Sequence, residues 1–399
     1  MKRYNIFIAF TIVATLVGCN KDINTTTEEW GDINIPLDPS KHYIHFDADV
    51  NTRGALVEGS LLLDDFMVVG YQYPGTWESE AVLAMPNVFD GTPERVYYRS
   101  NGTYDYLDKP DEKFKVWTGN KYSFFAYYPS DHGAITFFDN GTAKQGNPYI
   151  IYKLPISSDP RDLIDVMTAS YIDTGVASSA SVGLEFHHRL CAIDVGARNY
   201  YEYNHDQDPA TPNKDVTIEI VNLEVNLTNV TSTSAKIYLD HTIPTELNYI
   251  SPKASISYKM VDKDSEWAVS SYDVKPNTAS DRAIRLVTTP SGDNASSLLL
   301  LPQEDLLQGA LKLTYKKKYQ EDNGTWTYLK NDNGGEEFVV NSNDSPDPNN
   351  PSLPIKFTKQ LIEGRRYYIE LTFTSDAVSV NIIAADEWED KEDINHEFE

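Results

Sequence analysis

Apolar and polar residues alternate with a period of two in many short segments of the chain, a pattern typical of half-buried β-strands. Residues 43–50 (YIHFDADV) form the first clear example. The apolar positions that share one face are Ile44, Phe46, Ala48 and Val50. Histidine and aspartate occupy the positions between them, so the pattern predicts a strand with one face in a core and the other in solvent.

The same alternation predicts further strands along the whole chain. They cover residues 64–73, 94–100, 114–129, 147–155, 181–197, 216–227, 234–239, 296–303, 310–319, 365–373 and 377–384. Within 216–227 the apolar positions shift by one residue around Asn222, which indicates a β-bulge. Residues 296–303 are apolar on both faces, so we expect a central strand that is covered on both sides. Only residues 158–170 and 304–310 have patterns that suit a helix, and both segments are short.

The number and spacing of these strands favour an all-β chain built from two β-sandwiches in tandem. Near Leu190 the apolar positions change parity, as expected where a strand passes from one sheet to another. The predicted boundaries are 1–18 for a signal peptide, 19–40 for a flexible tether, 41–193 for the first sandwich and 194–399 for the second.

The first residues indicate export and a lipid anchor. Lys2 and Arg3 precede an apolar run over residues 6–17, the arrangement of a secretory signal peptide. The ending Leu-Val-Gly-Cys resembles the lipobox of bacterial lipoproteins. The resemblance implies that Cys19 becomes the first residue of the mature chain and that its sulfur carries the lipid anchor. Residues 20–40 are polar without a sustained period, so we expect a flexible tether behind that anchor.

Charge and cysteine content restrict the partners. The chain has 399 residues, 60 acidic and 34 basic, and a net charge of −26 at pH 7. Nucleic acids and anionic membrane surfaces repel such a chain, so neither is an expected partner. With Cys19 carrying lipid, Cys191 is the only other cysteine, and no intramolecular disulfide is expected. No segment after the signal peptide reaches the length of a membrane-spanning helix.

Motifs for catalysis or cofactor binding are absent from the sequence. It has no Gly-x-Ser-x-Gly turn, no His-Glu-x-x-His, no phosphate-binding glycine loop and no Cys-x-x-Cys. His187 and His188 are adjacent, so on a strand they face opposite ways and cannot bind one ion together. The acidic loops 262–266 and 331–337 lack EF-hand spacing. We expect no enzyme activity, cofactor or metal, and we assign the lysines of 312–318 to a protected sheet edge.

Tryptophan in loops is a candidate for glycan contact, because an exposed aromatic ring stacks on the face of a sugar. Trp117 adjoins the core face of its strand, so it is assigned to packing. The loop residues that we expect to be exposed are Trp77, Trp267 and Trp326.

Several segments occur in an order that resembles the fimbrillin family of Bacteroides-type bacteria. They are Cys19 in the lipobox, Thr52-Arg53-Gly54 after the first strand, YSFFAYYP at 122–129, Phe186-x-His188-x-Leu190, LLLLPQ ending at Gln303, GRRYYIELTF at 364–373, and Trp388. Members of this family are lipoprotein pilins with two tandem transthyretin-like β-sandwiches. The dipeptide Lys21-Asp22 also resembles the signal that sends lipoproteins of these bacteria to the outer surface of the outer membrane.

The resemblance implies a mode of assembly. In fimbrillins a trypsin-like protease cuts the lipidated precursor after an arginine, the first strand leaves, and a strand of the next subunit fills the groove. Arg53 would be the processing site here, and the exchanged strand would carry Ile44, Phe46, Ala48 and Val50. The implied partners are other pilus subunits, the outer membrane through the lipid anchor, and a receptor or glycan on a host or bacterial surface.

One segment departs from the pattern of a repeating pilin. The acidic tail after Ala385 offers only Ile394 and Phe398 as alternating apolar residues, which favours a tip, anchor or accessory subunit. We therefore expect a non-enzymatic cell-surface lipoprotein that serves in adhesion as a fimbrial subunit. One alternative is a lipoprotein of a polysaccharide-uptake system that binds glycan through the loop tryptophans. Another is a hydrolase whose paired carboxylates no spacing reveals.

Overall fold

The structure is a computed structural model that describes residues 27–30, 33–36, 42–50, 65–80, 87–99, 103–106, 114–118, 120–138, 146–155, 157, 159, 162–174, 181–201, 215–264, 270–276, 284–286, 297–340, 353–374 and 377–384. The regular structure of these residues is almost entirely β-strand. Among them α1 (Trp77–Glu80) is the one α-helix, and it contains 4 residues. The predicted all-β class is confirmed. In this part of the chain no helix has the length and apolar character needed to cross a bilayer.

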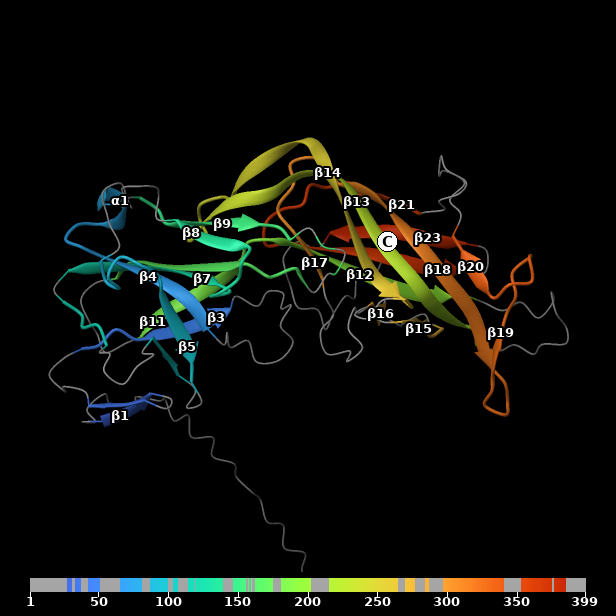
Figure 1. Ribbon diagram of the computed structural model, residues 1–399, viewed down its shortest axis with the longest axis horizontal. Coiled ribbons are helices and arrows are strands. Elements are labelled where there is room, and N and C mark those ends of the chain that lie inside the picture. The colour runs from blue at the N-terminus through green and yellow to red at the C-terminus, as the bar shows by residue number, and fades with distance from the viewer. Residues whose placement is uncertain are drawn as a thin grey trace, which may run out of the picture.

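Strands from the first half of the chain close into a barrel, which lies at the left of Figure 1. In order around the barrel they are β10 (Met167–Thr174), β11 (Val182–His188), β3 (Phe46–Val50), β6 (Tyr104–Asp105), β5 (Glu94–Tyr98), β4 (Asp65–Tyr73) and β7 (Lys121–Tyr128). The pair β3–β11 is parallel, whereas the other pairs are antiparallel. Inward side chains fill the barrel with a cluster rich in aromatic rings, including Phe46, Phe66 and Phe124.

The other described strands form a hairpin and two larger sheets. The hairpin pairs β1 (Thr27–Trp30) with β2 (Ile33–Pro36), inside the segment that was expected to be a tether. The nine-stranded sheet contains β8 (Ile135–Phe138), β9 (Tyr149–Lys153), β13 (Thr217–Tyr238), β14 (Glu246–Asp262), β15 (Tyr272–Val274), β18 (Gln308–Gln320), β19 (Trp326–Tyr328), β20 (Glu337–Val339) and β21 (Leu353–Lys356). The five-stranded sheet contains β12 (Cys191–Tyr200), β16 (Ile284–Arg285), β17 (Leu298–Leu300), β22 (Arg366–Thr374) and β23 (Val378–Ala384).

The two larger sheets pack face to face. Between them lies the larger hydrophobic cluster, in which the Tyr315 ring of β18 is 5.1 Å from the Phe373 ring of β22. The same cluster continues onto the outer wall of the barrel, where Tyr127 of β7 stacks on Phe137 of β8 with 6.1 Å between the ring centroids. Apolar packing is therefore continuous from the barrel to the paired sheets.

The 22-residue strand β13 connects the two halves of the protein. From Thr217 to Thr228 it pairs with β18, and from Ser234 to Tyr238 it pairs with β9. Along its other edge it pairs with β14. The sequence predicted separate strands at 216–227 and 234–239, but the buried side chains between them keep one strand continuous. The bulge predicted at Asn222 is confirmed by a register shift against β18.

The change of face near Leu190 marks the passage of the chain from β11 in the barrel to β12 in the five-stranded sheet. However, β8 and β9, which precede that point, pair within the sheet of β13. The division into two sandwiches at residue 193 stays a prediction.

Neither segment that suited a helix forms an α-helix in its described residues, and the last residues of each belong to a strand. Residues 167–170 begin β10, which pairs with β7, and 308–310 begin β18, which pairs with β13. Met167 and Ala169 point into the barrel core, so burial on a period of two outweighs the weak helix propensity. Strand β17 is buried as predicted. It is not central, since β12 is its one pairing partner among the described strands.

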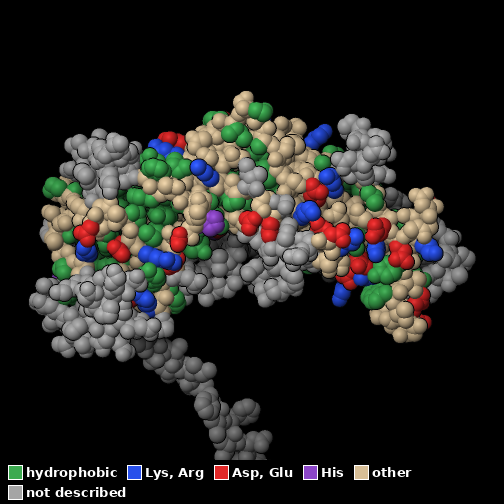
Figure 2. All heavy atoms as spheres, viewed as in Figure 1, with side chains coloured by type: hydrophobic (Ala, Val, Ile, Leu, Met, Phe, Trp, Pro, Cys, Tyr) green, Lys and Arg blue, Asp and Glu red, His purple; other side chains and the backbone are tan. Residues whose placement is uncertain are grey.

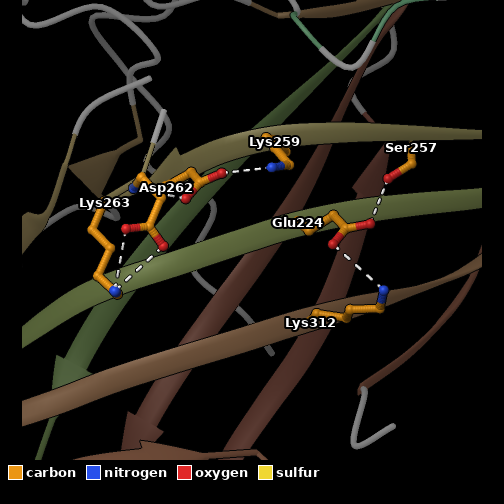
Figure 3. Close-up of polar contacts among 7 residues, drawn as sticks. Glu224, Ser257, Lys259, Asp262, Lys263 and Lys312 are labelled. Atoms are coloured by element: carbon orange, nitrogen blue, oxygen red, sulfur yellow. Dashed lines mark hydrogen bonds and ion pairs between the residues drawn. The ribbon is translucent and has the colours of Figure 1, made fainter. Parts of the chain in front are cut away.

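The lysines of β18 do not protect a sheet edge, which corrects the sequence interpretation. β18 lies between β13 and the short strands β19, β20 and β21. Two of its lysines meet acidic partners. Glu224 accepts a hydrogen bond from Lys312 at 3.5 Å and from Ser257 at 2.5 Å (Figure 3). Lys318 pairs with Glu219 at 3.1 Å. The ammonium groups of Lys316 and Lys317 lie over the aromatic rings of neighbouring residues. Charge pairing and contact with aromatic rings therefore explain the cluster.

A buried charge lies in the turn between β11 and β12. The Arg189 guanidinium is fully buried and donates to the Ile243 carbonyl at 2.8 Å and to Thr168 Oγ1 at 3.2 Å. It also forms an ion pair with Glu363. Burial lowers the pKa of Arg189 and raises the pKa of Glu363, and the attraction between the two charges opposes both shifts. Arg189 thus joins the barrel, the turn after β13 and the turn before β22.

The close approach of β18 to β13 predicts that Gly309→Ala destabilises the protein. A Cβ at Gly309 would lie 2.1 Å from the Asn226 carbonyl oxygen, so the two strands must separate. We expect a loss of about 1–3 kcal/mol in the free energy of unfolding, measured by urea denaturation. Gly183→Ala is the matched control, because a Cβ there has no atom within 4 Å. Equal stability of the two variants would contradict the close-approach argument.

The pairing of Arg189 with Glu363 predicts that substitutions of the two residues have non-additive effects on the free energy of unfolding. Arg189→Met leaves the Glu363 carboxylate without its cation and should cost about 3–5 kcal/mol in unfolding free energy. Glu363→Gln in the Arg189→Met background should recover part of that loss, because no unpaired charge remains. A double-mutant cycle by urea denaturation measures the coupling, and strictly additive losses would argue against the ion pair.

Candidate assembly site at the first barrel strand

The first barrel strand, β3, has neighbours on both edges. Phe46 to Val50 pair in parallel with Val182 to Phe186 of β11. On the other edge Phe46 pairs with Tyr104 of β6. Because both edges carry backbone partners, β3 is an interior strand of the barrel wall.

The residues just before β3 are held by the segment 114–117. Ile44 N donates to the Lys115 carbonyl at 2.9 Å, and Trp117 N donates to the His42 carbonyl at 2.9 Å. Trp117 Nε1 donates to the Tyr43 carbonyl at 3.0 Å. Trp117 therefore has a packing and hydrogen-bonding role, as its position on the core face predicted.

Side chains of the first strand fill the middle of the barrel. The relative exposure of Ile44 is 0% and that of Phe46 is 1%. Phe46 contacts the rings of Phe66, Phe89, Tyr106 and Phe124 with centroid distances of 6.5, 6.3, 6.0 and 5.4 Å. Ala48 is half-buried against the same cluster, and the side chain of Val50 lies outside the described residues.

His45 departs from the simple alternation of the first strand. It was expected on the solvent face with Asp47 and Asp49, which are exposed, but it is buried. The Phe114 ring packs edge-on against the imidazole with 5.0 Å between centroids. Burial lowers the pKa of His45 from 6.5 to about 4, so the ring is neutral in the folded barrel at pH 7.

Removal of the first strand would leave an apolar groove between β6 and β11. Ile44 and Phe46 together bury hydrocarbon worth roughly 3–6 kcal/mol, before the entropy of ordering is counted. The vacated position would also leave the backbone groups of β11 and β6 unpaired. A strand with apolar residues at alternate positions satisfies both needs.

The two residues assigned to processing and anchoring, Arg53 and Cys19, lie outside the described residues. Arg53 follows Val50, the last residue of β3, by three positions in the sequence. Its role as a cleavage site and the lipidation of Cys19 stay predictions.

The structure does not bring the candidate glycan tryptophans together. Trp77 is buried against the rings of Tyr71 and Phe125, each 4.9 Å away, so its expected exposure was wrong. The short helix α1 turns this ring inward, where Nε1 donates to Asn147 Oδ1 at 3.1 Å. Trp326 is 43% exposed on β19, at the opposite end of the molecule from α1 in Figure 1. Trp267 lies outside the described residues.

The histidines point to separate partners, as predicted for adjacent strand positions. His187 stacks on His241 with 3.8 Å between centroids, and His188 Nδ1 lies 2.7 Å from Asp165 Oδ2. In the described part of the chain no three histidine, cysteine, aspartate or glutamate side chains gather around a common point suited to a metal ion. Cys191 is a free, buried thiol whose pKa is raised by burial.

Sequence reasoning missed the partners of the first strand. Neither the parallel pairing with 182–186 nor the cover by Phe114 has a local signal, because both depend on residues far along the chain. The one available clue was the alternation of Val182, Leu184 and Phe186, which marks a strand without naming its neighbour.

Comparison with known proteins supports a common origin for this architecture. The family described as Fimbrillin-like matches residues 73–386. No curated protein matches the chain. A fimbrial protein from Bacteroides vulgatus has a similar structure, with a TM-score of 0.53, 19% identity, and coverage of 87% of this chain and 99% of that one. A candidate cell adhesion protein from Bacteroides ovatus aligns with a TM-score of 0.45, 13% identity, and coverage of 88% and 99%.

The first of these structures shares the fold, whereas the second is too distant in structure to support an argument. The family match extends from the last residue of β4 to just beyond β23 and so includes most of the barrel and both larger sheets. On that match, the chain belongs to the Fimbrillin-like family.

Proposed function

We propose that the protein is a cell-surface fimbrial subunit that assembles by exchanging its first barrel strand for a strand of another subunit. The observation that carries this proposal is the position of β3, which is interior to the barrel and yet precedes every other barrel strand in the sequence. One cut after Val50 would therefore free it without breaking any other strand connection. The match to the Fimbrillin-like family and the similar structure of the fimbrial protein from Bacteroides vulgatus are consistent with this role.

The energetics of the barrel also favour exchange over simple loss. A barrel without β3 exposes the cavity of Ile44 and Phe46 and the unpaired edges of β6 and β11. A strand from a neighbour recovers both the apolar burial and the backbone hydrogen bonds. Strand addition is then driven by the same interactions that hold β3 in the uncut protein.

We assign the lipid anchor to Cys19 and the cut to Arg53, and we place the protein at the outer membrane surface or in a pilus. The acidic tail after Ala385 favours a tip, anchor or accessory subunit, since it has few apolar residues to insert in a groove. The proposed role is adhesion through a receptor or glycan, without enzyme activity.

Limited proteolysis tests the exchange. Trypsin treatment of the chain with Cys19→Ser, which prevents lipidation, should cut after Arg53 and produce a ladder of oligomers that resist SDS without heating. N-terminal sequencing should identify Gly54 as the new first residue. Adding a peptide with the sequence of residues 43–50 should suppress the ladder by refilling the groove.

The matched control is Arg53→Gln, which removes the cut and should leave a monomer under the same conditions. A chain that is cut at Arg53 and stays monomeric argues against exchange. A ladder that forms equally well from Arg53→Gln argues against this processing site.

His45 predicts that acid loosens the first strand. Its pKa is about 4 in the barrel and 6.5 when free, so between these values the released strand binds a proton that the packed strand does not. The free energy of unfolding therefore contains the full contribution of the packed His45 ring above pH 6.5. As the pH falls toward 4, the free energy of unfolding decreases by about 3 kcal/mol in all. Urea denaturation at pH 7 and pH 4.5 measures the loss.

His45→Leu keeps an apolar side chain against Phe114 and removes the titration, so its stability should change less between the two pH values. A second variant, His132→Leu, replaces a histidine at a half-exposed turn position outside the barrel strands and controls for the loss of a histidine as such. Identical pH dependence in the His45→Leu variant and the wild-type protein would show that another group is responsible.

A further inference from the structure

A row of aromatic side chains crosses the nine-stranded sheet near its β8 edge. Phe138 of β8 stands opposite Tyr149 of β9, and Tyr149 stands opposite Tyr238 of β13. The ring centroids are 5.9 Å apart in the first pair and 6.1 Å apart in the second. Side chains at directly paired positions share a face of the sheet, so the three rings form one continuous row.

The row faces solvent, whereas the residues beside it in sequence face the core. Phe138 is 42% exposed, and Tyr149 and Tyr238 are half-buried. Their neighbours Ile150 and Ile237 are fully buried. Figure 2 shows hydrophobic side chains gathered at the surface over β8 and β9. The rings are thus presented by strands whose backbone the core holds rigid.

Polar groups border the row without giving it a net charge. The Lys236 ammonium lies 4.4 Å from the Tyr149 ring centroid and 4.3 Å from that of Tyr238. Glu246 of β14 accepts a hydrogen bond from the Tyr238 hydroxyl at 2.7 Å and pairs with Lys236 at 3.5 Å. The cation therefore lies over one face of the Tyr149 and Tyr238 rings and leaves Phe138 uncovered by it, while Glu246 stands at the hydroxyl end of Tyr238. Both charged groups keep further hydrogen-bonding capacity.

The small size of the row favours a small ligand over a protein as its partner. A fully covered aromatic side chain buries about 150–250 Å², and these three rings are only partly exposed. They offer a few hundred Å² at most, below the roughly 800 Å² per partner of a stable protein interface. A sugar ring needs only a ring-sized apolar surface with hydrogen-bonding groups at its rim.

We propose that Phe138, Tyr149 and Tyr238 form a binding site for an uncharged polysaccharide. The C–H face of a sugar stacks on Phe138 and Tyr149, while Lys236 and Glu246 contact its hydroxyl groups. An uncharged ligand fits because the ion pair neutralises the site and because a polyanion would meet an acidic protein. The site goes beyond the proposed assembly role, since none of its residues belongs to the barrel.

Affinity electrophoresis of the Cys19→Ser chain tests this site. Native gels cast with laminarin, xylan, starch or hydroxyethyl cellulose provide uncharged ligands, and gels with pectin or heparin provide anionic ones. We expect at least one uncharged polysaccharide to slow the protein, and Phe138→Ala or Tyr149→Ala to raise the dissociation constant about tenfold, as for loss of one stacking contact. Phe138→Trp should retain binding, because the stacking face remains.

The matched control is Tyr171→Ala, which removes an aromatic side chain of similar exposure (39%) on β10 of the barrel and should leave binding unchanged. Circular dichroism verifies that each variant is folded. Three results would overturn the site: no retardation in any uncharged gel, equal retardation of Phe138→Ala and wild type, or self-association by sedimentation that Phe138→Ala abolishes. Phe138→Ala should leave the trypsin-induced ladder intact. A failure of the polysaccharide site can therefore be told apart from a failure of strand exchange.

Discussion

Backbone pairing along β13 is the constraint on which the rest of the structure depends. This one strand pairs with β9 and with β18. β9 precedes the last two barrel strands in the sequence, whereas β18 follows the barrel and lies in the paired sheets. A break in β13 would therefore separate two parts of the same core. The close contact at Gly309 and the bulge at Asn222 adjust this strand to its neighbours, and the buried Arg189 adds polar contacts where the chain crosses between sheets.

The first strand is packed tightly, so the proposed exchange has to overcome a large loss of buried apolar contacts. Its two buried apolar side chains alone contribute several kcal/mol, and each 1.4 kcal/mol lowers the released population about tenfold. An uncut barrel therefore keeps β3 in place nearly all the time, which is why the proposed exchange includes a covalent cut. The pH also matters, because the strand is held most firmly at pH values at which the His45 ring is neutral in both the packed and the released strand. In the proposed exchange, the contacts that would disfavour assembly before the cut are the same ones that would favour it afterwards.

Alternation in the sequence located strands well but could not assign their neighbours. The first strand, the bulge at Asn222 and the change of sheet near Leu190 were all predicted from local patterns. The long strand β14 was missed because its first half is exposed on both faces, although Ile256, Tyr258 and Met260 alternate as a strand should. Trp77 looked exposed beside its glycine, yet one turn of helix carries it into the core. The aromatic row on β8, β9 and β13 combines residues from three strands, so only register reveals it.

The parallel pairing of β3 with β11 also bears on how the polypeptide reaches its final state. Phe46 emerges early during synthesis, but Val182, which stands opposite it in the parallel pair, follows only after five other barrel strands. Contacts between such distant segments form slowly, because a long loop must close before they contribute. The barrel cannot close until β11 has been synthesised, so the nascent chain passes through a long interval without a closed barrel. Such a delay would be compatible with the export proposed for this chain, in which the polypeptide crosses a membrane before it folds.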